Sequence, residues 1–79
     1  LKTFRNEDLK LVPNFIESVF FLFCSEITNE GIQYLPTSLK SLEMKHCSKL
    51  DRGVIKYLPK ELKQLSIEQF HNNSSIKLE

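Results

Sequence analysis

Apolar residues recur along the chain at a fixed spacing of 23 positions. Residues 35–47 read Leu-Pro-x-x-Leu-x-x-Leu-x-Met-x-x-Cys, and the apolar positions of this pattern return at 58–70. A looser copy occupies residues 12–24. A fixed period of this length is typical of proteins in which like units stack on one another.

The second half of each unit alternates apolar and polar residues. Leu42 and Met44 are separated by one polar residue, as are Leu65 and Ile67, and this period of two is typical of a half-buried strand. We expect short strands at 17–21, 41–45 and 64–68. They should pair in parallel, because each is followed by a crossover that returns to the same edge of the sheet.

The first half of each unit predicts a short helix. Asn6, either Thr28 or Asn29, and Asp51 are of the residue types that cap helix N-termini, and each precedes apolar residues. A proline follows each predicted helix, at positions 13, 36 and 59, and proline disfavours helical geometry in the residue before it. The predicted fold class is α/β.

The period divides residues 1–79 into the parts of a single domain. We expect a truncated first unit at 1–15, two full units at 16–38 and 39–61, and a terminal unit at 62–79. Residues 1–10 align with 24–33, so the first unit lacks its strand, and the chain does not begin with Met. We therefore expect a fragment or a processed piece of a larger protein, in which further chain or a partner covers the strand at 17–21. The polar run 71–75 should be a loop or a frayed end, with Ile76 and Leu78 hinting at a further turn.

Residues 39–47 and 62–70 resemble the strand-and-turn signature of the leucine-rich repeat superfamily. Residues 24–35, which read Cys-x-x-Ile-Thr-x-x-Gly-Ile-x-x-Leu, are similar to the cysteine-containing subclass found in F-box substrate receptors. The Leu-Pro-x-x-Leu segments at 35–39 and 58–62 resemble repeats of bacterial effector proteins. The resemblance implies a curved solenoid with short parallel strands on its concave face and short helices on its convex face, and it implies protein binding. Phe70 departs from the family pattern, which usually has Asn or Cys in that turn.

Composition excludes several classes of function. Eleven Lys and Arg oppose ten Asp and Glu, and they are interspersed, unlike the basic stripe that binds nucleic acid. The longest apolar run, at 19–23, is far shorter than the roughly 20 residues that span a bilayer. The chain has only two glycines, hence no phosphate-binding glycine loop, and its Cys and His spacings fit no zinc motif. We expect no nucleic-acid partner, membrane span, small-molecule substrate or cofactor.

The two cysteines, Cys24 and Cys47, occupy equivalent positions 23 residues apart. They should lie side by side about 4.8 Å apart, a spacing that a disulfide could bridge. We favour the alternative that both are free cysteines, buried as small apolar side chains in the core of a protein from a reducing compartment. The expected location is intracellular and cytoplasmic, or inside a host cell if the chain belongs to a bacterial effector.

The candidate partner-binding residues are those that alternate with the core positions. They are Phe20, Leu22, Phe23, Glu43, Lys45, His46 and Glu68. Large apolar side chains such as Phe20 and Leu22 are unexpected on an outward face unless something covers them. Lys45 and Glu68 should form a lateral charge pair. The apolar residues are either a protein-binding hot spot, or a contact with preceding chain, or part of a first strand packed on both faces.

No catalytic site is predicted. His46 and Cys47 are neighbours and should point to opposite faces of the sheet, so they cannot act as base and nucleophile. His46 with Glu43 or Glu68 would lie on an open face and lacks a third orienting group. We expect a protein-interaction module that binds a partner on its concave sheet, with substrate recognition for a ubiquitin ligase or a bacterial effector as two specific versions. The alternative is a structural or assembly subunit whose apolar strand face is filled by neighbouring chain, with no separate ligand.

Overall fold

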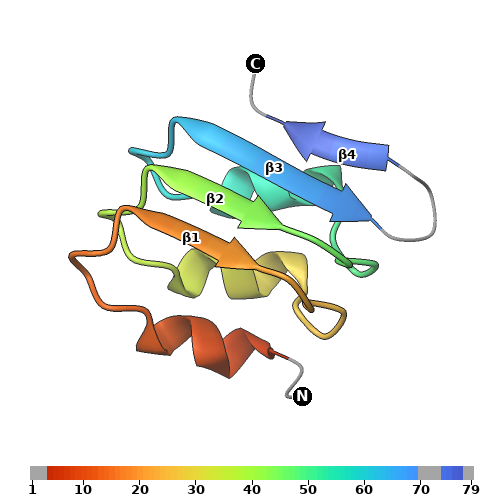
Figure 1. Ribbon diagram of the computed structural model, residues 1–79, viewed down its shortest axis with the longest axis horizontal. Helices are drawn as coiled ribbons and strands as arrows, with labels where there is room; N and C mark the ends of the chain where they lie inside the picture. The colour runs from red at the N-terminus through yellow and green to blue at the C-terminus, as the bar shows by residue number, and fades with distance from the viewer. Residues whose placement is uncertain (1–3, 70–73, 78–79) are drawn as a thin grey trace.

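A sheet backed by three short helices makes up the structure, a computed structural model that describes residues 4–69 and 74–77 (Figure 1). Helices alternate with the first three strands, and in Figure 1 they are stacked along one side of the sheet, with the first helix lying beyond the first strand. In chain order the elements are η1 (Asn6–Leu11), β1 (Ser18–Phe21), η2 (Asn29–Tyr34), β2 (Ser41–Met44), η3 (Arg52–Tyr57), β3 (Gln64–Gln69) and β4 (Ser74–Lys77).

Strands β1, β2 and β3 pair in parallel, as the sequence predicts. Val19 lies beside Leu42, and Leu42 lies beside Leu65, so residues 23 positions apart are lateral neighbours. The strand bounds differ by a residue or so from the expected ones, because β1 starts at Ser18, β2 ends at Met44 and β3 continues to Gln69. The hydrophobic period therefore sets the register of the sheet.

The entry into each strand uses the same backbone bonds. The carbonyl oxygen of Glu17 accepts from the amides of Lys40 and Ser41 at 2.8 and 2.9 Å, and the carbonyl oxygen of Lys40 accepts from those of Lys63 and Gln64 at 2.8 and 3.0 Å. Equivalent residues thus have equivalent partners in successive segments of the chain.

The three helices are 3₁₀ helices of six residues each. A 3₁₀ helix has three residues per turn, so side chains three apart share a face. Leu9 and Val12, and likewise Ile32 and Leu35, have this spacing and pack into the core. The sequence predicted short helices but not their type.

Each helix ends before a proline. Val12, Leu35 and Leu58 precede the three prolines and have extended backbone, with ψ of 120, 149 and 147°. The N-terminal predictions are partly wrong. Asp51 does cap η3, since its side chain accepts from the Gly53 amide at 2.8 Å, but Arg5 rather than Asn6 precedes η1.

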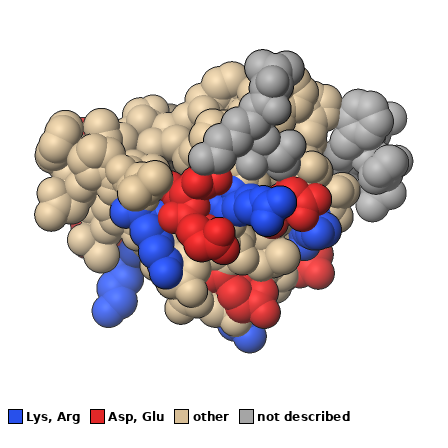
Figure 2. Space-filling view, turned by 90° about the horizontal axis from the view of Figure 1, so that it is seen from below, with Lys and Arg blue, Asp and Glu red and all other residues tan. Residues whose placement is uncertain are grey.

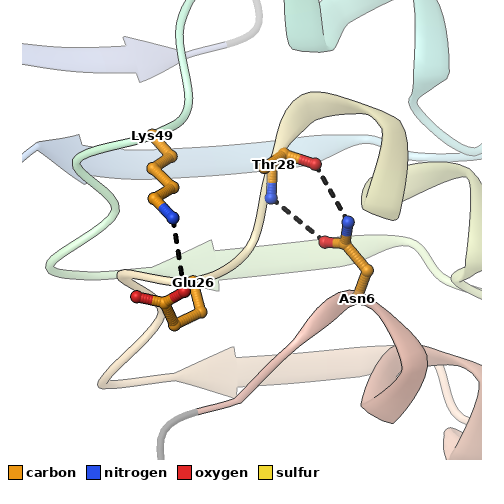
Figure 3. Close-up of polar contacts among 4 residues, drawn as sticks. All are labelled: Asn6, Glu26, Thr28 and Lys49. Carbon is orange, nitrogen blue, oxygen red and sulfur yellow. Dashed lines mark hydrogen bonds and ion pairs between the residues drawn. The ribbon is translucent and has the colours of Figure 1, made fainter.

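Instead of capping η1, the side chain of Asn6 forms hydrogen bonds with Thr28 at the start of η2 (Figure 3). Its side-chain oxygen accepts from the Thr28 amide at 3.0 Å, and its nitrogen donates to Thr28 Oγ1 at 2.9 Å. Lys49 Nζ lies 3.2 Å from Glu26 Oε1 in the same view. Polar side chains therefore join successive segments in addition to the sheet.

The core lies between the sheet and the helices. Leu39, Leu42, Met44 and Ile67 are buried there with Cys24 and Cys47. Phe21, at the end of β1, packs edge-to-face on Phe4 with ring centroids 5.1 Å apart. Val19 is only half-buried, because β1 has no further strand beside it in the described residues.

Strand β4 corrects the expectation of a loop or frayed end for residues 74 and 75 and of a turn at Ile76. Residues 71–73 and Leu78 lie outside the described residues, so the expectation for them stays a prediction. Ser74–Lys77 is a strand that pairs antiparallel with β3, with Ile76 opposite Ile67. Only four residues separate Gln69 from Ser74, too few for the crossover that parallel pairing needs. Phe70 lies outside the described residues, so its role in the turn stays a prediction.

Candidate protein-binding face

The solvent face of the sheet carries large apolar side chains at β1. Phe20, Leu22 and Phe23 are 53, 42 and 40% exposed, and we call these three residues the β1 patch. Phe20 faces out because its neighbours Val19 and Phe21 face the core, as period two requires. The sequence predicted this outward orientation.

Charged residues just after β2 and within β3 adjoin the β1 patch. Lys45 Nζ lies 3.8 Å from Glu68 Oε2 and 5.8 Å from the centre of the Phe20 ring. The predicted lateral pair of Lys45 and Glu68 is therefore present. Both side chains are well exposed, so the pair stabilises the fold by at most about 1 kcal/mol.

Glu43 is the register partner of Phe20. Its side chain is exposed, and among the described residues it forms none of the ion pairs of the sheet face. The solvent face is thus apolar at β1, and the carboxylate of Glu43 lies beside this apolar region. The positive charge of Lys45 is balanced by the carboxylate of Glu68.

His46 lies just after β2 and stacks on Phe23. The ring centroids are 5.5 Å apart and the ring planes are inclined by 12°. His46 has φ of 60°, a left-handed conformation that costs a non-glycine residue roughly 1–2 kcal/mol. The alignment of Phe23 with His46 was evident from the period, but the turn that brings their rings together was not.

The cysteines do not belong to this face. Both are free, and both are fully buried. The hydrogen bond between the two thiols, together with burial, raises the pKa of Cys47 well above its usual range. The prediction of buried, unbridged fillers is confirmed, and the compartment in which they stay reduced remains a prediction.

His46 and Cys47 are neighbours in the chain but differ in burial. Cys47 is fully buried, whereas His46 is half-buried and its ring stacks on Phe23. In residues 4–69 and 74–77 no three His, Cys, Asp or Glu side chains gather closely enough to hold a metal ion. No helix in that part of the chain has the length and apolar character to cross a membrane.

A second apolar surface lies at the β1 end of the molecule. An open cavity of about 480 Å³ is lined by Phe4, Asp8, Leu11, Val12, Pro13, Ile16, Ser18, Val19 and Phe21. Leu11, the last residue of η1, is 77% exposed, and Phe15, in the loop that follows, is 74% exposed. The sequence predicted an uncovered core at this end, and the cavity is lined by residues of η1, of β1 and of the loop that joins them.

Figure 2 views the molecule from this end. Charged side chains gather across the middle and lower part of the view, whereas the upper left of the view is mostly tan.

Comparison of the chain with protein-family models, with curated proteins and with solved structures finds no match. The function is therefore argued from the site geometry.

Proposed function

We propose that the strand and helix segments are coils of a leucine-rich-repeat-type solenoid, and that the solvent face of its sheet binds a protein partner. The β1 patch carries this proposal. Its three large apolar side chains are 40–53% exposed, with Phe20 on the solvent face of β1 and Leu22 and Phe23 just beyond the end of that strand. The outward residues of β2 and β3 are polar or charged. Exposed apolar side chains grouped in this way mark interaction sites.

The β1 patch supplies apolar anchor residues for the partner, and polar residues in and near the neighbouring strands orient that partner. Buried aromatic anchors dominate interface energies, often at about 2 kcal/mol or more each, and Phe20 and Phe23 are suited to this role. Glu43 lies beside Phe20 and offers a carboxylate to a basic residue of the partner. Lys45, His46 and Glu68 surround the patch as a polar rim, of the kind that excludes water from the anchors.

The preferred partner is thus a protein segment that combines apolar anchors with a basic residue. Substrate recognition for a ubiquitin ligase and capture of a host protein by a bacterial effector are two settings in which such a module would act. Both settings rest on the family resemblance of residues 24–35 and of the Leu-Pro-x-x-Leu segments.

The experiment is a selection of short random displayed peptides against this chain, without counter-selection against either variant. For a selected peptide, fluorescence polarisation should show binding at least about 30-fold weaker to Phe20→Ser, the equivalent of about 2 kcal/mol. Phe15→Ser is the matched control, because Phe15 is more exposed than Phe20 and lies off the sheet face. Equal losses in both variants, or no loss in Phe20→Ser, would refute the proposal, provided that circular dichroism shows both variants folded.

A further inference from the structure

The outward side chains of the sheet carry a net negative charge beside the β1 patch. At the outward positions of β2 and β3 and at the residue that follows β2, the charged side chains are Glu43, Lys45 and Glu68. Two carboxylates thus oppose one ammonium, whereas the whole chain has a formal net charge of +1. This part of the surface is therefore opposite in sign to the molecule as a whole, and it favours a cation.

Glu43 is the member of this group whose charge is not balanced. Lys45 Nζ lies 3.8 Å from Glu68 Oε2, and the ion pairs among the described residues include none with Glu43. The Glu43 side chain is exposed. In the register of the sheet it lies between Phe20 of β1 and Ser66 of β3, which carry no charge. Its carboxylate is thus available to a cation that approaches from solvent.

The ring of Phe20 already contacts a cation. Lys45 Nζ lies over the ring, 5.8 Å from its centre, which is close to the outer limit of about 6 Å for this kind of attraction. Lys45 follows β2, so the positive group approaches the ring from the side of that strand. Glu43 belongs to the same strand. A cation that reaches this side of the ring therefore lies near an unbalanced carboxylate.

We propose that Phe20 and Glu43 together bind an arginine side chain of the protein partner, and that they select arginine over lysine. This inference rests on the proposed protein-binding role of the sheet face. Adjacent strands lie about 4.8 Å apart, so a planar group stacked on the Phe20 ring is within reach of the Glu43 carboxylate. A guanidinium is planar, stacks on aromatic rings and donates two parallel hydrogen bonds to one carboxylate. It therefore satisfies both residues at once.

Lysine fits the same two residues less well. Its ammonium is a compact and strongly hydrated charge, which does not stack on a ring or match a carboxylate with two parallel bonds. Lys45 repels either cation, since its own ammonium lies over the ring. Only the guanidinium offsets this repulsion with stacking and a two-bond contact, while Lys45 keeps its pair with Glu68.

The rest of the β1 patch strengthens the contact when a partner binds. A contact between a cation and an aromatic ring is weak in water and becomes stronger when water is removed. Leu22 and Phe23 offer the partner an apolar contact area next to Phe20, and a partner that covers them also shields Phe20 and Glu43 from solvent. We therefore expect a segment in which an arginine lies next to apolar residues.

Peptides selected from the displayed library test the inference. Arginine should be enriched over lysine in them, and replacement of the peptide arginine by lysine should weaken binding to the original chain at least about fivefold in fluorescence polarisation. In Glu43→Gln the arginine and lysine peptides should bind within about twofold of one another, because the two-bond contact is lost. Phe20→Leu removes the ring but keeps an apolar side chain, so it should reduce the preference for arginine while it retains part of the affinity.

Glu30→Gln is the matched control, because Glu30 is also exposed but lies in η2 rather than in the sheet. It should keep the full preference for arginine. Peptides that need Phe20 but bind equally well with lysine would overturn this inference and leave the protein-binding role intact. So would a preference for arginine that Glu43→Gln retains.

Two further outcomes would overturn the protein-binding role together with this inference. One is a selection that yields no peptide, and the other is binding that Phe20→Ser leaves unchanged. A second copy of this chain on the sheet face would overturn the arginine inference alone. Sedimentation velocity would then show dimers that Phe20→Ser disperses, and selected peptides would bind only to the Phe20→Ser monomer.

Discussion

Gly31 leaves open the space through which the Asn6 side chain reaches Thr28. A Cβ atom at position 31 would collide with the Asn6 carboxamide, which accepts from the Thr28 amide and donates to its hydroxyl. A similar pair of bonds joins Asn29 to Asp51, at 2.8 and 3.2 Å. Side-chain amides therefore link the starts of consecutive helices.

Gly31→Ala should destabilise the fold by about 1–3 kcal/mol, the usual cost of overpacking. Urea denaturation followed by circular dichroism measures it. Gly53→Ala is the control, because its Cβ would lie 3.0 Å from the nearest side-chain atoms and should cost less. Equal stability of Gly31→Ala and the original chain would show that Asn6 is not confined by Gly31.

Asn6→Ala should cost about 1–3 kcal/mol, since it leaves the partly buried Thr28 amide unsatisfied. In the Asn6→Ala background, Gly31→Ala should cost much less than it does alone, because the colliding side chain is gone. A double-mutant cycle by urea denaturation measures this coupling. Strictly additive effects would contradict the contact.

The carboxyl group of Asp51 makes the stability of the fold depend on pH. The hydrogen bond from Asn29, and then that from the Gly53 amide, hold the pKa of Asp51 below its usual 3.8. The ionised form therefore favours the fold at pH values above the usual pKa, and this contribution is lost as the pH falls through the lower pKa of the folded state. Thermal denaturation between about pH 2 and pH 6 should show a smaller acid-induced loss for Asp51→Asn than for the original chain. Parallel pH profiles would contradict this assignment.

The thiols of Cys24 and Cys47 should resist alkylation. Both side chains are fully buried, and the raised pKa of Cys47 disfavours its reactive thiolate. Iodoacetamide at pH 8 should modify them only as fast as the chain opens, with mass spectrometry as the readout and urea-unfolded chain as the reactive control. Rapid alkylation under native conditions would show that the core is open at this position.

Leu42→Ala should cost about 2–5 kcal/mol, because Leu42 is buried at the centre of the sheet between Val19 and Leu65. Domains of this size are stable by only about 5 kcal/mol or a little more, so the variant should be close to unfolded in the absence of denaturant. Phe15→Ala, at a position that is 74% exposed, should leave the urea midpoint nearly unchanged. Similar midpoints for the two variants would contradict the central place of Leu42.

Most of the candidate site could be predicted from the alternation of apolar and polar residues within the strands. Val19 and Phe21 are core positions, so the outward direction of Phe20 follows from period two. The lateral pairing of Lys45 with Glu68 follows from the 23-residue spacing, since equivalent residues of parallel neighbours lie side by side. The stacking of Phe23 on His46 did not follow, because it depends on the left-handed backbone of His46.

The sequence by itself determined the parallel order and register of β1, β2 and β3. Residues such as Leu42 and Leu65 can all be buried in only one register, because a slip of one position would turn every apolar side chain to solvent. Only the tertiary structure decided the 3₁₀ form of the helices, the reach of Asn6 to Thr28 and the antiparallel addition of β4. Those features depend on distances between segments, on the space that a missing Cβ leaves and on an available strand edge, and none of these is a property of residue order alone.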